Sequence, residues 1–252
     1  MALLFRGRRN SSAPNRDRDV DARMSVVEHL EDLRRALIIA LAGWILATIV
    51  AFVFWHPIFG FLIHRAGLEK VVFFAPTGGF MLGLKIAFVV GLVAASPIIF
   101  WQIWWFVSPG LHEHERRLAL PLVAATTFFF LLGVGFAMFA LPLIMRVLTG
   151  GIFVGSDIQY LPAGDELLGF IFLITIAFGL VFELPVVLYT LGMLRIISSR
   201  WLYRHRAYWL VGLGLLANFM TPGADPLTPL LVFVPLYVFW EGTALLLKLT
   251  GH

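Results

Sequence analysis

Two carboxylates in a short charged segment are the side chains best placed to bind a specific partner. Glu113 and Glu115 follow an aromatic run that begins at Trp101 and ends in a Ser-Pro-Gly break, and a second apolar run begins at Leu118. The apolar run on each side holds this segment in place. Carboxylates held in this way can accept the planar fork of a guanidinium group, which lysine cannot reproduce. The pattern therefore predicts a binding site for cationic groups.

The elements that position these carboxylates follow from composition. The chain has 252 residues, of which 60% are hydrophobic and 13% charged, with a net charge of +4. Soluble domains are about 45–50% apolar and about 25% charged, so this is an integral membrane protein. The sequence has no cysteine, which excludes disulfides, thiolate nucleophiles and cysteine-based metal sites. Protease, hydrolase and P-loop motifs are also absent, so nothing indicates an enzyme.

Hydropathy predicts an all-α polytopic protein with six transmembrane helices. About 20 apolar residues cross the hydrocarbon core, and the fifth run, of about 15 residues, spans about 22 Å. We expect the last two helices to be short for a bilayer. One run contains Lys85 near its start and ends before Ser108; the others are Ala36–Trp55, Leu118–Met145, Leu167–Leu194, Ala207–Thr221 and Leu227–Leu247. The membrane domain covers residues 25–248, between a disordered tail (1–24) and a short C-terminal tail (249–252).

Charge distribution predicts the orientation. With both termini in the cytoplasm, the inner segments carry 15 Lys and Arg residues, and the outer loops carry only Arg65, Lys70 and Arg146. This agrees with the positive-inside rule. Topology explains the positive charge, so the sequence gives no reason to expect nucleic-acid binding.

Five acidic residues gather on the inner side, where loops are normally basic. Glu28, Glu31 and Asp32 precede the first apolar run, and Glu113 and Glu115 lie between the second and third. One interpretation is that they are solvated helix ends paired with nearby arginines. The other is that they form the cationic-group site described above. The arginines in question are Arg34, Arg35, Arg116 and Arg117.

Three further charged residues could carry a function. Glu183 lies inside the fourth apolar run, two residues before Pro185, where a charge costs about 2.5–3.5 kcal/mol on insertion scales. A kink at Pro185 is expected to open local space beside Glu183. Glu183 is either a protonated acid that links helices, a contact for a partner subunit, or a proton-linked group. Lys85 is expected to extend its amine to the interface or to form a polar contact. Asp225, in a tight outer turn, is expected to form that turn. No histidine spacing indicates a metal site.

Several segments together resemble the TatC family, the multi-spanning core of the twin-arginine protein translocase. The resemblance covers about residues 25–248. Gly78 stands where the family usually has an acid. The matching segments are HLEDLRRAL at 29–37, APTGGF at 75–80, ASPIIFWQIWWFVSPGLHEHERR at 95–117, AFGLVFELPVVL at 177–188, the TP-containing turn at 221–225 and VPLYVFWE at 234–241.

The resemblance implies a location in a bacterial or archaeal cytoplasmic membrane. It implies that folded proteins with twin-arginine signal peptides dock on the cytoplasmic face and cross with TatA- and TatB-type subunits, driven by the proton-motive force. It also implies self-association within the translocase, and no cofactor. Asp32, Arg34 and Glu115 match the family's signal-binding residues, with Glu31 and Glu113 beside them. Glu183 matches its intramembrane glutamate, and Asp225 its outer-turn acid.

Two other hypotheses remain open. An ion- or proton-coupled secondary transporter using Glu183 and Lys85 predicts solute uptake by the chain alone. A passive membrane scaffold predicts that the acidic residues matter only for stability.

Overall fold

The computed structural model is helical almost throughout. It describes residues 26–68, 70–107, 119–149, 161–221 and 227–251. The acidic candidates Glu113, Glu115 and Asp225 lie outside these ranges. The helices are α1 (Val26–Val53), α2 (Trp55–Arg65), α3 (Gly78–Val107), α5 (Ala119–Thr149), α6 (Gly164–Val181), α7 (Leu184–Met193), α8 (Ser199–Arg204), α9 (Arg206–Met220) and α10 (Leu227–Leu249).

Within the described residues, five helical segments are long and apolar enough to cross a membrane: 27–53, 78–107, 120–149, 164–193 and 229–249. The predicted fifth run forms α9, which has only 15 residues. The prediction that the last helix is short is wrong. α10 has 23 residues, or about 34 Å at 1.5 Å per residue, and the predicted run from Leu227 to Leu247 already gives about 31 Å. The protein is thus a multi-pass, all-helical membrane protein.

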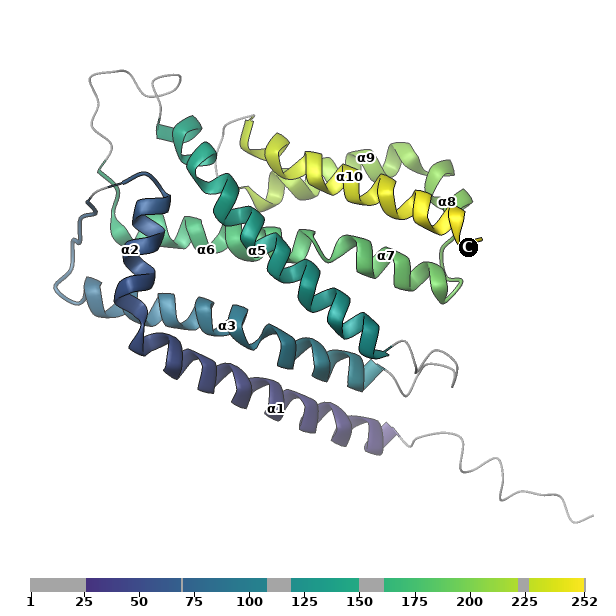
Figure 1. Cartoon of the computed structure of the whole chain (residues 1–252), viewed down its shortest axis with the longest axis horizontal. Coiled ribbons are helices and arrows are strands. Elements are labelled where there is room, and N and C mark those ends of the chain that lie inside the picture. Colours follow the sequence, from purple (N-terminus) through teal and green to yellow (C-terminus); the bar gives the residue numbers. More distant parts are fainter. Residues whose placement is uncertain (1–25, 69, 108–118, 150–160, 222–226, 252) are drawn as a thin grey trace, which may run out of the picture.

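The long helices alternate in direction (Figure 1). One end of the molecule, which we call the α8 end, gathers the start of α1, the end of α3, the start of α5, the end of α7 and the end of α10. The opposite end, the α2 end, holds α2, the starts of α3, α6 and α10, and the end of α9. This alternation is what successive membrane crossings require.

Two buried apolar clusters hold the helices together, and α5 and α6 contribute to both. The first joins α5, α6 and α7 to α8, α9 and α10, with Trp240 and Phe178 at its centre. The second joins α2 and α3 to the first half of α6 and to another face of the same part of α5, through Leu82, Ile86 and Leu168. The pair α5–α6 is therefore the central element of the fold.

Glycine permits the closest helix crossings. A Cβ on Gly133 of α5 would lie 2.4 Å from the Phe178 carbonyl oxygen and 2.9 Å from the Gly179 Cα of α6. A Cβ on Gly91 of α3 would lie 2.7 Å from the Thr48 Cα of α1. Small residues at such crossings let helix backbones approach in a membrane, where van der Waals packing drives association.

The α1 helix is peripheral. It packs chiefly on α3, and large apolar side chains such as Leu41, Ile45 and Ile49 are exposed along its outer face. In water such a face would be a liability. In a bilayer it contacts lipid, which agrees with the composition.

The predicted kink in the fourth span is confirmed as a break between α6 and α7. Phe182 and Glu183 separate the two helices, and Pro185 lies in the first turn of α7. Proline has no N–H to donate to the carbonyl four residues earlier, and its ring crowds that carbonyl. The chain therefore turns beside Glu183 inside the span.

At the α2 end, the two long connections pair with each other. The Val72 N–H donates to the Pro162 carbonyl at 3.1 Å, and the Gly164 N–H donates to the Val72 carbonyl at 3.0 Å. The Phe73 ring lies beside two glycines: an added Cβ would be 2.9 Å from it at Gly78 and 2.8 Å at Gly164. Glycine at position 78 therefore leaves room for the Phe73 ring, which a larger side chain there would displace.

Candidate functional site

The first candidate surface is the beginning of α1 at the α8 end. Glu31 and Arg34 are exposed and Asp32 is half-buried. The His29 ring stacks on Phe106 near the end of α3, with centroids 4.4 Å apart and planes at 17°. This contact fixes the acidic turn of α1 against α3. The exposed acids of a rigid helix end can then receive cationic groups without a large ordering cost.

The predicted partners of this turn, Glu113 and Glu115, lie outside the described residues. They follow Val107 at the end of α3 and precede Ala119 at the start of α5. Both of these helix ends lie at the α8 end, where α1 begins (Figure 1). The juxtaposition of the two acidic segments stays a prediction, and the arrangement of the helix ends is compatible with it.

Glu183 occupies the break between α6 and α7. Its side chain is 8% exposed, and it contacts the α5 backbone at Phe130. Its Oε1 atom is buried without a hydrogen-bond partner among the described residues. Pro185 also leaves the Val181 carbonyl without its i+4 N–H donor. A polar group arriving from outside the chain could therefore find two acceptors here.

An apolar groove begins next to this break. It has a volume of about 330 Å³ and lies between the first turns of α5, helix α7 and the last part of α10, which places it toward the α8 end. Its lining is almost entirely nonpolar and includes Pro121, Phe129, Pro185, Val186, Met193 and Leu246.

Lys85 is not close to Glu183. Its Nζ forms an ion pair with the Asp165 Oδ1 at 3.0 Å, and both side chains are about half exposed. Asp165 lies in the first turn of α6, and Glu183 follows it by eighteen residues, or about 27 Å of helix. A single ion site using both Lys85 and Glu183 therefore has no support in this geometry.

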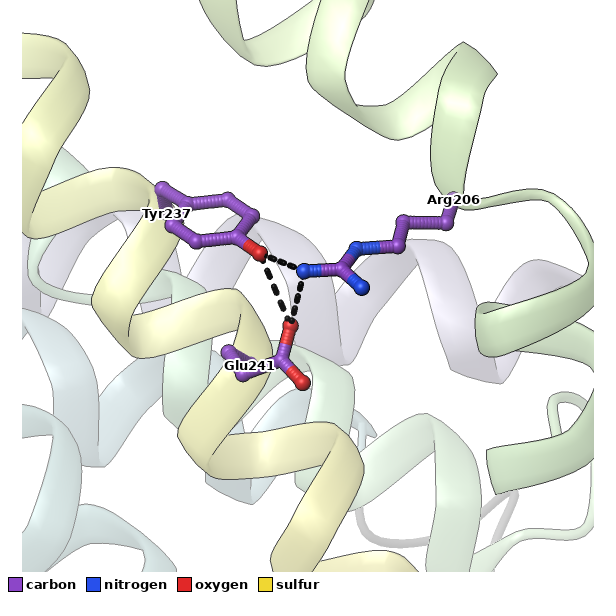
Figure 2. A network of polar contacts seen from close by, with 3 residues as sticks. All are labelled: Arg206, Tyr237 and Glu241. Atoms are coloured by element: carbon purple, nitrogen blue, oxygen red, sulfur yellow. Dashed lines mark hydrogen bonds and ion pairs between the residues drawn. The ribbon is translucent and has the colours of Figure 1, made fainter.

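A fourth polar group was not found from the sequence. Arg206, at the start of α9, contacts the Tyr237 hydroxyl and the Glu241 Oε2 of α10, the latter at 3.4 Å (Figure 2). The Tyr237 hydroxyl donates to the same Glu241 oxygen at 3.2 Å. Tyr237 and Glu241 are four residues apart, hence on one helix face. An acid inside an apolar run, one helical turn after a tyrosine, was the available signal.

The described residues contain no group of three or more His, Asp or Glu side chains that could hold a metal ion. The polar groups of the membrane domain are instead separate. The α1 acids lie at the α8 end, Glu183 lies within the helix bundle, and the pair Lys85–Asp165 lies toward the α2 end. Such an arrangement suits several binding contacts better than one reaction centre.

Comparison with known proteins gives a consistent result. Residues 28–235 match the family model described as Sec-independent protein translocase protein (TatC). The chain is 36% identical over 232 residues to the protein of that name from Carboxydothermus hydrogenoformans, covering 90% of this chain and 94% of the relative. It is 32% identical over 231 residues to the one from Aquifex aeolicus, covering 90% and 95%.

The fold agrees with solved structures. A crystal structure of the twin-arginine translocase receptor TatC superposes with a TM-score of 0.76 at 31% identity, covering 89% of this chain and 100% of the other. A second crystal structure of that receptor, in the detergent DDM, gives a TM-score of 0.77 at 31% identity, covering 87% and 99%. By sequence and by fold, this chain belongs to the TatC family of Sec-independent protein translocase proteins.

Proposed function

We propose that the chain is a receptor subunit of the twin-arginine translocase that binds twin-arginine signal peptides at the cytoplasmic face. With TatA- and TatB-type subunits it nucleates export of folded proteins driven by the proton-motive force. Membership of the TatC family makes the chain a transport protein and not an enzyme. The observation that carries the receptor role is the acidic turn of α1, held against α3 by the His29–Phe106 stack.

The proposal assigns six membrane crossings with the α8 end in the cytoplasm. The positive-inside count supports this orientation, as does the alternation of the helices (Figure 1). In this orientation α9 is the fifth crossing. Its 15 residues give about 22 Å of helix, whereas the hydrocarbon core is about 30 Å thick. A span this short is accommodated by local thinning of the bilayer. Thinning next to a translocase subunit lowers the barrier that a folded cargo must cross.

Signal recognition is assigned chiefly to Asp32 and Glu115, which receive the two guanidinium groups of the signal. Glu31, Arg34 and Glu113 complete the surface around them. Removing one partner of a buried ion pair costs about 3–5 kcal/mol, removing one of an exposed pair costs about 0–1 kcal/mol, and a half-buried pair lies between these limits. Asp32 is half-buried, so its loss should matter more than the loss of an exposed acid on the same turn.

The groove beside Glu183 is assigned to the transmembrane helix of a single-span partner subunit. Its nonpolar lining suits an apolar helix, and the buried Oε1 of Glu183 has no hydrogen-bond partner in the described part of the chain. A partner helix carrying one hydroxyl or amide opposite the break would bond that oxygen. Copies of the chain then assemble around such partners within the translocase.

Crosslinking in native membranes tests the receptor role. Photo-reactive residues at Val27 and Leu30, both exposed on the first turns of α1, should crosslink to a twin-arginine peptide. The control probe is at Phe74, which is 86% exposed at the α2 end. A peptide with two lysines should crosslink weakly, because lysine lacks the planar fork. Equal crosslinking from Phe74, or equal crosslinking of both peptides, contradicts the assignment.

Matched variants then test the residues. Asp32→Ala should reduce docking far more than Glu28→Ala, and Glu115→Gln far more than Glu113→Gln, at unchanged protein abundance. Equal and small losses within both pairs would mean that only general surface charge contributes.

A further inference from the structure

A basic pocket lies at the α2 end, between the end of α2 and the last turns of α5. We call it the outer pocket; its volume is about 420 Å³. The polar residues come from two segments about 80 residues apart in the sequence. Its lining includes His64, Arg65, Arg146, Thr149, Leu68 and Met145.

The fold holds Arg65 in place through an irregularity in α5. Pro142 has no N–H to donate to the carbonyl of Met138, four residues earlier. The Arg65 Nε donates to that carbonyl at 2.9 Å. One edge of the guanidinium is thereby fixed, and its two terminal nitrogens are left for another acceptor. Arg65 is half-buried in this position.

Neither arginine of the pocket has an acidic partner within the described ranges. Basic side chains in the last turn of a helix are favourable in themselves, which accounts for one cation at each helix end. This preference does not account for both arginines lining the same pocket. A second basic pocket, at the α8 end, contains Arg200 and Lys248, but positive charge there is what the topology requires.

The outer side is where the positive-inside rule disfavours arginine. Only three Lys or Arg residues lie in the predicted outer loops, and two of them, Arg65 and Arg146, line this pocket. Two arginines and a histidine provide N–H donors for phosphate oxygens, while the Thr149 hydroxyl already donates to the Met145 carbonyl at 2.7 Å. Leu68 and Met145 supply apolar contacts beside those donors, at the end of a membrane span. A soluble anion needs no such apolar wall, whereas a lipid headgroup joined to acyl chains does.

We infer that the outer pocket binds the phosphate of an anionic phospholipid, whose acyl chains extend beside α5. The leaflet assignment rests on the topology of the proposed function, but the binding itself does not. A bound lipid would link α2 to α5 and so hold the connections at the α2 end against the helix bundle.

Native mass spectrometry of the full-length protein in detergent tests the inference. The probes are phosphatidylglycerol, phosphatidylcholine and inorganic phosphate. We expect one phosphatidylglycerol to be retained in preference to phosphatidylcholine. Arg146→Gln should weaken retention at least about tenfold, as expected for loss of a charge-assisted hydrogen bond. Lys70→Gln is the matched control, because Lys70 is an exposed outer cation that does not line the pocket.

Arg65→Lys gives a second test that keeps the charge and removes the fork; it should weaken retention while Lys70→Gln does not. Equal retention by the parent and by Arg146→Gln would overturn the inference. Competition by millimolar inorganic phosphate, with the same sensitivity to Arg146, would show that a free anion and not a lipid is the ligand, and would also overturn it. Neither result affects crosslinking of a twin-arginine peptide to α1. The lipid-binding inference and the proposed receptor function can therefore be refuted independently.

Discussion

The crossing of α5 and α6 can be tested with two glycines on the same helix. Gly133 faces α6, and a Cβ there would lie 2.4 Å from the Phe178 carbonyl oxygen. Gly135, two residues later, has no atom within 4 Å of its Cβ position. Gly133→Ala and Gly135→Ala therefore add the same methyl group, one against backbone and one into open space.

The two substitutions are expected to change the free energy of unfolding in opposite directions. An ordinary van der Waals contact is 3.4–4 Å, so Gly133→Ala forces the two backbones apart by about 1 Å. Overpacking of this kind costs about 1–3 kcal/mol. Alanine in a helix gains about 0.5–1 kcal/mol over glycine at both positions, and at Gly133 the overpacking offsets that gain. The two variants should therefore differ by the overpacking cost, about 1–3 kcal/mol.

Thermal unfolding of the purified variants in the same detergent provides the measurement. Gly133→Ala should unfold several degrees below the parent, and Gly135→Ala at or above it. Gly179, on the other side of the crossing, lies only four residues before Glu183. Partner retrieval should therefore fall in Gly133→Ala and remain normal in Gly135→Ala. Equal unfolding temperatures for the two variants would refute the close crossing.

Three further predictions concern charged residues and orientation. Glu183→Gln should keep partner retrieval, because an amide still hydrogen-bonds, and Glu183→Ala should weaken it at unchanged abundance; full cargo export by Glu183→Ala would contradict a partner contact. A double-mutant cycle on Lys85 and Asp165 should give a coupling of about 0–1 kcal/mol in detergent, since both side chains are half exposed; a coupling above about 2 kcal/mol would mean that the pair is desolvated. A single cysteine at Ser156 should be labelled from outside and one at Ser198 from inside, and a cytoplasmic Ser156 would overturn the topology.

Hydropathy and proline placement predict most of the fold. Apolar runs of membrane length show where the long helices lie, because the chain must satisfy its backbone hydrogen bonds internally in lipid. Pro185 predicts the break in the fourth span, which the structure places at Phe182 and Glu183. The end of the last helix is predicted less well: α10 continues past Leu247, and nothing in the hydropathy of that run shows where the helix stops.

The polar pairings could not be predicted, because they join residues far apart in sequence. Lys85 and Asp165 are 80 residues apart, and they meet only because α3 and α6 pack side by side. Arg206 and Tyr237 are 31 residues apart, and they meet only because α9 and α10 are antiparallel neighbours (Figure 1). Local periodicity gives the face of a helix, but it does not give the identity of the helix that covers that face.

Glu183 and Glu241, which both lie inside apolar runs, differ in a way that bears on function. Glu241 is paired, since Arg206 and Tyr237 both contact its carboxylate (Figure 2). Glu183 is more deeply buried, and its Oε1 has no partner within the described ranges. Unsatisfied polar groups in hydrocarbon are costly, so the chain alone leaves one cost unrelieved beside an apolar groove. A second polypeptide that fills the groove and bonds this oxygen removes that cost. A subunit that assembles with single-span partners needs such a position, whereas a passive scaffold does not.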